Sequence, residues 1–97
     1  MENNQIEIPV QELVDSINMY PVQSSNIVAM GYNETNRVLR VIFRGNSSYL
    51  YFNVEPEVWQ LLMNSESKGR ALNESIVRQK EKYKYVKLKQ LTESKEE

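Results

Sequence analysis

The side chains best suited to chemistry in this sequence are two arginines and two tyrosines that alternate with apolar residues. Arg40 and Arg44 fall in one predicted strand, and Tyr49 and Tyr51 fall in the next. Guanidinium groups bind phosphates, and aromatic rings stack on unpaired bases. Because successive side chains of a strand point to opposite faces, we expect all four residues to share one sheet face. This set predicts a binding surface, but it does not identify the ligand.

No set of residues in the sequence predicts a reaction. The 97 residues include no histidine and no cysteine, which removes the commonest general base, the thiolate nucleophile and the commonest metal ligands. Ser67 stands beside Lys68, but a lysine in an exposed turn is protonated and cannot act as a base. The acidic residues lack the spacing of a calcium-binding loop. We therefore expect a protein that is not an enzyme and has no catalytic residue, metal site or cofactor.

Charge is distributed unevenly along the chain. The formal net charge is −1, yet residues 68–89 hold eight basic side chains and only two acidic ones. Four lysines of that stretch, Lys80, Lys82, Lys84 and Lys87, are candidates for phosphate contacts, and an ordinary solvated lysine-rich surface is the alternative. No apolar run resembles a signal peptide or a membrane span. We expect a cytoplasmic protein without membrane association.

The elements around these residues predict a small α+β domain. Ile27–Tyr32, Val38–Arg44 and Tyr49–Phe52 predict an antiparallel meander, and Tyr83–Lys89 alternates like a fourth, edge strand. Pro56 predicts the start of a covering helix. We expect three to four strands packed with two to three helices. The predicted core comprises Ile27, Ala29, Leu39, Val41, Phe43, Leu50, Phe52, Val54, Val58, Trp59, Leu62 and Ile76.

Smaller residues predict where the chain turns and where its helices begin and end. Gly45 supplies a permissive backbone at the turn between the second and third strands. Gly69 predicts a left-handed stop after the first covering helix, and Asn73 predicts the cap of a second one.

The N-terminal stretch is acidic and carries one apolar stripe. Val10, Leu13, Val14 and Ile17 follow one another at helical spacing, and no basic residue precedes Val22. This pattern predicts a short amphipathic helix that docks on the domain, with homodimerisation through the same stripe as the alternative. A strand at residues 6–8 is an alternative for the start of this segment.

The order of these landmarks resembles the KTSC domain, a family of short bacterial and phage domains that also occurs at the C-terminus of some lysyl-tRNA synthetases. The resemblance spans Val22–Leu88, and the family often has an aromatic pair where this chain has Ala71-Leu72. The resemblance implies a KTSC-like domain over residues 22–89, while composition predicts an acidic N-terminal arm over residues 1–21 and a disordered polar tail over residues 90–97. The matching landmarks are Ser24-Ser25, Gly31-Tyr32, Gly45, the central Tyr49-Leu50-Tyr51, Val54, Pro56, Ser67, Gly69, Asn73 and Ile76.

The resemblance implies RNA as a candidate ligand, because RNA binding has been suggested for the family from its attachment to a synthetase. In that hypothesis Tyr49 and Tyr51 stack on bases, while Arg40, Arg44 and the lysines contact phosphates. The alternative is a protein–protein adaptor that uses the tyrosine face or the N-terminal helix, as a homodimer or with another protein. Two simpler interpretations remain open. The tyrosines could form a second core face beneath a helix, and the arginines could form a solvated surface.

Overall fold

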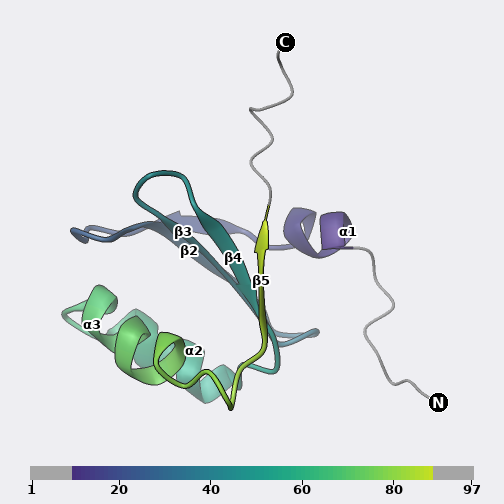
Figure 1. Ribbon diagram of the computed structural model, residues 1–97. Coiled ribbons are helices and arrows are strands. Elements are labelled where there is room, and N and C mark those ends of the chain that lie inside the picture. Colours follow the sequence, from purple (N-terminus) through teal and green to yellow (C-terminus); the bar gives the residue numbers. More distant parts are fainter. Residues whose placement is uncertain (1–9, 89–97) are drawn as a thin grey trace, which may run out of the picture.

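The computed structural model describes residues 10–88, which fold into one five-stranded antiparallel sheet with helices on both of its faces (Figure 1). The strand order is β1-β2-β3-β4-β5, so each strand pairs with the next one in sequence. The elements are α1 (Val10–Asp15), β1 (Met19–Pro21), β2 (Ile27–Asn33), β3 (Val38–Phe43), β4 (Ser48–Tyr51), α2 (Pro56–Asn64), α3 (Lys68–Leu72), the π-helix η1 (Asn73–Val77) and β5 (Tyr85–Leu88).

The α+β class and the antiparallel meander are confirmed, and so is the edge strand near the C-terminal end of the described chain. The expected number of three to four strands was too low, because β1 was missed. This strand has only three residues and ends in Pro21, so it carries no recognisable alternation. The two predictions for residues 6–8 and 90–97 lie outside the described residues.

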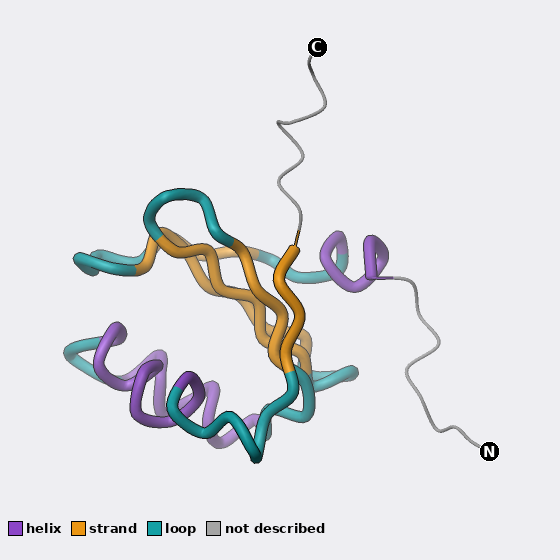
Figure 2. Tube along the Cα trace, in the orientation of Figure 1, coloured by secondary structure: helices purple, strands orange, loops and turns teal. Residues whose placement is uncertain are grey.

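Helices cover the two faces of the sheet unequally. One face packs against α2, α3 and η1, and we call it the α2–α3 face; the other packs against α1, and we call it the α1 face (Figure 2). The larger core cluster lies on the α2–α3 face, and the smaller one joins α1 to the opposite side of the sheet. The larger cluster contains Val22, Ile27, Met30, Leu39, Val41, Tyr51, Val54, Leu62, Ala71, Leu72, Ile76 and Tyr83. The smaller cluster contains Leu13, Ile17, Val38 and Leu50, with Val14, Met19, Phe52 and Leu88 packed against it.

The register between β3 and β4 contradicts the predicted face assignment. Leu39 pairs with Tyr51, and Arg40 pairs with Leu50. Because directly paired residues of an antiparallel ladder share a face, the tyrosines lie with Leu39 on the α2–α3 face and Arg40 lies with Leu50 on the α1 face. The prediction that both arginines and both tyrosines share one surface is therefore wrong. A one-residue difference in hairpin register is enough to exchange every side chain of one strand between faces.

The turn between β3 and β4 sets this register. Gly45 has φ +90° and Asn46 has φ +72°, so two consecutive residues adopt left-handed conformations, as expected at Gly45. The Phe43 amide donates to the Ser47 carbonyl at 2.7 Å and closes the loop. The sequence identified the turn but not the pairing across it.

The predicted helix boundaries hold at α2 and fail at α3. Pro56 is the first residue of α2, as expected. Gly69 does not stop a helix, because it lies inside the first turn of α3, where the Ser67 side chain accepts a hydrogen bond from the Arg70 amide at 3.4 Å. Asn73 has helical dihedral angles (φ −61°) and is the first residue of η1, so α3 runs directly into η1 and Asn73 does not cap a separate helix.

Helix α1 docks on the sheet, as the apolar stripe predicted. Leu13 and Ile17 are buried, whereas Val10 is exposed. Gly31 on β2 makes this docking possible, because a Cβ atom there would lie 2.3 Å from the Asn18 carbonyl oxygen and 2.6 Å from Cγ2 of Ile17. The α1–β1 connection therefore crosses the sheet where β2 has no side chain.

Candidate functional site

Three tyrosines gather on the α2–α3 face at the β4–β5 edge of the sheet, and we call them the tyrosine cluster: Tyr49, Tyr51 and Tyr85. The Tyr49 and Tyr51 rings stack with centroids 6.2 Å apart, and the Tyr85 ring lies 5.9 Å and 5.8 Å from them. Phe43 extends the row, with its ring edge-on to Tyr49 at 5.7 Å. The pairing of β4 with β5 assembles the cluster, because Tyr51 lies directly opposite Tyr85.

The members of the tyrosine cluster differ in exposure, and this separates a structural ring from accessible ones. Tyr51 is 6% exposed, and its burial, with Tyr49 and Tyr85 beside it, raises its pKa to about 12. Tyr49 is partly buried, and Tyr85 is 49% exposed. Tyr51 is thus a core residue, as the simpler interpretation held. Tyr85 was absent from the predicted site, although the alternation of Tyr85 with Lys87 could have indicated it.

The two arginines make structural contacts away from the tyrosine cluster. The Arg40 Nε donates to the Ser48 hydroxyl at 3.1 Å on the α1 face, and partial burial lowers the pKa of the Arg40 guanidinium. The Arg44 guanidinium donates two hydrogen bonds to the Ser24 carbonyl oxygen, from Nη2 at 2.9 Å and from Nε at 3.3 Å. Arg40 therefore lies on the face opposite the tyrosines, and the Arg44 guanidinium is engaged by the Ser24 carbonyl.

All four predicted lysines are exposed, but only one shares a face with the tyrosine cluster. Lys87 lies directly opposite Tyr49, so its side chain is on the α2–α3 face. Lys84 precedes β5 and alternates to the other face. Lys80 and Lys82 lie in the connection that leads to β5, and the Lys82 Nζ is 4.0 Å from a Glu55 carboxylate oxygen.

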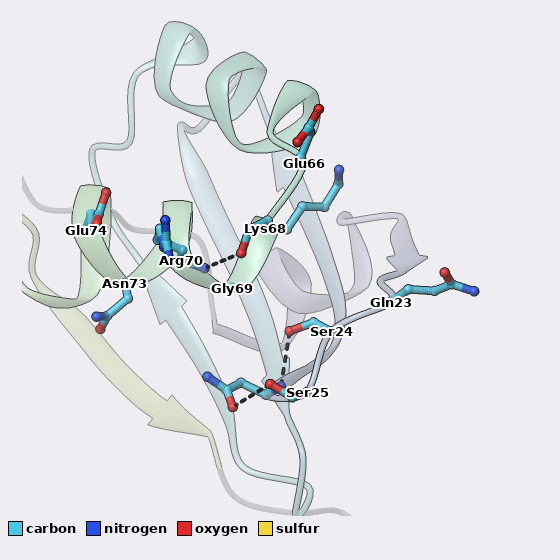
Figure 3. Close-up of a pocket in the computed structure, with 11 residues that line it drawn as sticks. Gln23, Ser24, Ser25, Glu66, Lys68, Gly69, Arg70, Asn73 and Glu74 are labelled. Carbon is cyan, nitrogen blue, oxygen red and sulfur yellow. Dashed lines mark hydrogen bonds between the residues drawn. The ribbon is translucent and has the colours of Figure 1, made fainter.

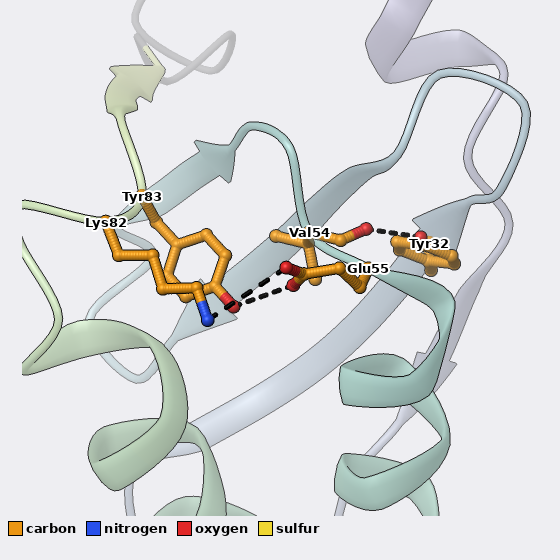
Figure 4. Close-up of polar contacts among 5 residues, drawn as sticks. All are labelled: Tyr32, Val54, Glu55, Lys82 and Tyr83. Carbon is orange, nitrogen blue, oxygen red and sulfur yellow. Dashed lines mark hydrogen bonds and ion pairs between the residues drawn. The ribbon is translucent and has the colours of Figure 1, made fainter.

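Partly buried polar contacts hold the start of α2 against the approach to β5 and against β2 (Figure 4). The Tyr83 hydroxyl donates to the Glu55 carboxylate at 2.9 Å, and the Tyr32 hydroxyl donates to the Val54 carbonyl. Burial and this bond to Glu55 raise the pKa of Tyr83 to about 12. The Glu55 pKa is lowered, chiefly by a hydrogen bond from its own backbone and then by the bond from Tyr83. The sequence contained no signal for this contact.

A polar hollow of about 600 Å³ opens between the β1–β2 loop and α3 (Figure 3), and we call it the polar pocket. Its lining is rich in hydroxyl and amide groups, and its two basic side chains are matched by two acidic ones. The lining residues are Gln23, Ser24, Ser25, Asn26, Glu66, Ser67, Lys68, Gly69, Arg70, Asn73 and Glu74. No ligand was predicted for this region from the sequence.

Within residues 10–88, no three acidic side chains come together as a metal site would require. Among the helices of that range, none is long and apolar enough to cross a membrane. Ala71 and Leu72, which stand where the resemblance led us to expect an aromatic pair, are buried in the larger core cluster.

A model of the KTSC domain family matches residues 23–88 of this chain. The chain belongs to the KTSC domain family. The matched range runs from the loop after β1 to the end of β5, so it includes the tyrosine cluster and the polar pocket. Helix α1 and strand β1 precede the match. Gly31, on which α1 docks, lies within it.

Two individual relatives and one solved structure are similar to this chain. The chain is similar to a protein of Tsukamurella paurometabola, with 46% identity over 57% of this chain and 82% of the relative. It is also similar to a protein of Stutzerimonas stutzeri, with 36% identity over 64% of this chain and 87% of the relative. The crystal structure of a KTSC domain protein from Yersinia pestis superimposes with a TM-score of 0.68 at 34% identity, covering 75% of this chain and 99% of that one.

Proposed function

We propose that this protein is a binding module for single-stranded RNA, with the accessible rings of the tyrosine cluster as its stacking surface. The observation that carries the proposal is Tyr85, which is 49% exposed and packs beside Tyr49 on the sheet face that also presents Lys87. Exposed aromatic rings beside cationic side chains are the usual composition of surfaces that bind unpaired bases.

Each side chain has a distinct part in this proposal. Tyr85 and Tyr49 stack on bases, and Tyr51 supports both rings from the core. Lys87 contacts a backbone phosphate near the stacked bases, because it lies directly opposite Tyr49 on the same sheet face. Arg40 and Arg44 are assigned no contact with RNA. Arg40 lies on the opposite sheet face and bonds to Ser48, and the Arg44 guanidinium already holds the Ser24 carbonyl.

The test is a fluorescence-anisotropy titration of a labelled short oligouridylate with the wild type and with Tyr85→Ala. Loss of one stacking partner is worth about 1–3 kcal/mol, which weakens binding roughly 5- to 150-fold. The matched control is Tyr20→Ala, because Tyr20 is also 49% exposed but lies on β1, at the opposite edge of the sheet. Equal affinities of the two variants would rule out stacking on Tyr85.

A protein partner is the second candidate function, and the outer edge of β5 favours it. The Phe52 amide donates to the Lys84 carbonyl at 2.9 Å, so alternate residues of β5 direct their backbone groups to β4. The backbone groups of Tyr85 and Lys87 consequently face outward, where no strand among the described residues pairs with them. Such an edge accepts an extended peptide. Salt separates the two functions, since RNA affinity falls steeply between about 50 and 200 mM salt and strand addition does not.

A further inference from the structure

The polar pocket has the composition of a site for a hydroxyl-bearing ligand rather than for a free anion. Lys68 and Arg70 are balanced by Glu66 and Glu74, so the lining carries no net charge to attract a phosphate. Its serine hydroxyls and asparagine or glutamine amides can each both donate and accept hydrogen bonds. Neutral groups of this kind suit ligands that also donate and accept, as sugar hydroxyls do.

The loop side of the polar pocket is held in place by bonds within the protein. The Ser24 carbonyl is fixed by the Arg44 guanidinium, and the Ser24 hydroxyl accepts from the Asn26 amide at 3.1 Å and from the Ile27 amide at 3.3 Å. On the opposite side, a Cβ atom at Gly69 would lie 3.0 Å from the Ser24 hydroxyl oxygen, so helix and loop approach closely. The pocket is therefore formed before any ligand arrives.

A row of contacts connects the polar pocket to the tyrosine cluster across the end of the sheet. The Arg44 amide donates to the Asn26 carbonyl at 2.8 Å, next to Phe43. The Phe43 ring contacts Tyr49, and Tyr49 contacts Tyr85. A strand whose bases stack on the tyrosines can thus continue past Phe43 toward the pocket.

We propose, resting on the function proposed above, that the polar pocket binds the ribose of a nucleotide adjacent to the stacked bases and so selects RNA over DNA. The 2′-hydroxyl is the group that distinguishes the two polymers, and it both donates and accepts hydrogen bonds. The Asn73 amide and the Ser25 hydroxyl are the side chains assigned to it, one from the helix and one from the loop (Figure 3).

The experiment compares the affinity of the protein for a short oligouridylate and for an oligodeoxyuridylate of the same length, which differ only at the 2′ position. We expect the wild type to prefer the RNA about two- to tenfold, the range that one or two hydrogen bonds supply. Asn73→Ala and Ser25→Ala abolish this preference by weakening RNA binding while DNA binding stays the same. Asn64→Ala removes an exposed amide outside the pocket and keeps the preference.

The outcomes separate this inference from the function on which it rests. If the wild type binds both oligonucleotides equally, or if Asn73→Ala and Ser25→Ala keep the RNA preference, the ribose site is overturned and stacking on the tyrosines is unaffected. If the wild type binds neither oligonucleotide, both proposals are overturned. Circular dichroism of Asn73→Ala and Ser25→Ala establishes that any lost preference belongs to folded protein.

Discussion

Replacement of Gly31 by alanine tests whether the docking of α1 depends on a missing side chain. Gly31 lies on β2 beneath the connection between α1 and β1. An added Cβ would lie 2.3 Å from the Asn18 carbonyl oxygen, 2.6 Å from Ile17 Cγ2 and 2.8 Å from Met19 Sδ. Ordinary contact distances are about 3.5–4.0 Å, so the connection must retreat by roughly 1 Å. Because one contact is a backbone oxygen, a change of side-chain rotamer cannot relieve the overlap.

The cost lies between two limits set by how far the segment moves. A local shift of the connection is a case of overpacking and costs about 1–3 kcal/mol. Complete undocking of α1 would expose Leu13 and Ile17, which are buried in the smaller core cluster, at about 1.5–3 kcal/mol for each side chain. The expected loss of unfolding free energy is therefore at least about 1 kcal/mol and at most about 6 kcal/mol.

Urea denaturation, monitored by circular dichroism and by Trp59 fluorescence, measures this loss of unfolding free energy. Trp59 stacks on Tyr32 at 5.5 Å, so it reports on the α2 layer, on the side of the sheet away from α1. A double-mutant cycle with Leu13→Ala distinguishes the two limits, since the effects are less than additive if Gly31→Ala already undocks the helix. A stability change below about 0.5 kcal/mol, the range of ordinary surface substitutions, would refute the reasoning.

Three further predictions concern the hydrogen bond between Tyr83 and Glu55, the hairpin turn at Gly45 and the proposed phosphate contact of Lys87. Tyr83→Phe should lower stability by about 0.5–1 kcal/mol at neutral pH, a modest value because the Glu55 side chain is 40% exposed. Because the folded state lowers the pKa of Glu55, its carboxylate stabilises the fold at pH values above the ordinary pKa of 4.5, and this stabilisation is lost as the pH falls through the folded pKa. The difference in unfolding free energy between wild type and Tyr83→Phe should therefore shrink in urea titrations at acidic pH. Gly45→Ala should cost about 1 kcal/mol in thermal melts through its φ of +90° alone, since no atom lies within 4 Å of the added Cβ. Lys87→Gln should reduce the slope of log affinity against log salt for oligouridylate by about 0.7, and an unchanged slope would exclude a phosphate contact there.

Much of the fold was predictable because it depends on local patterns. The strand at Ile27, the turn at Gly45 and the start of α2 at Pro56 each follow from a few neighbouring residues, and all three are confirmed. The helical ends at Gly69 and Asn73 were predicted wrongly. Gly69 lies close to Ser24, and Asn73 continues the helical backbone from α3 into η1. These roles outweigh the usual preference of the two residue types for helix ends.

The candidate site was harder to predict because its residues come from strands that are distant in the sequence. The central Tyr49-Leu50-Tyr51 motif was recognised, but its two rings differ in exposure. The most accessible ring of the tyrosine cluster, Tyr85, belongs to a strand more than thirty residues later. Arg40 and Arg44 are residues of the type that binds phosphate. In the structure they bond instead to the Ser48 hydroxyl and to the Ser24 carbonyl.

The sequence by itself determined the class of this protein and the order of its elements except β1, since apolar periodicity, turn residues and the family landmarks all depend on neighbouring residues along the chain. Only the tertiary structure decided which side chains share a surface. Strand register assigns every residue to a face, and a shift of one residue exchanges the faces. The pairing of Arg40 with Leu50 and of Tyr51 with Tyr85 therefore fixed the candidate site. Burial of Tyr51 then followed from the helices that cover that face, a contact that no local pattern encodes.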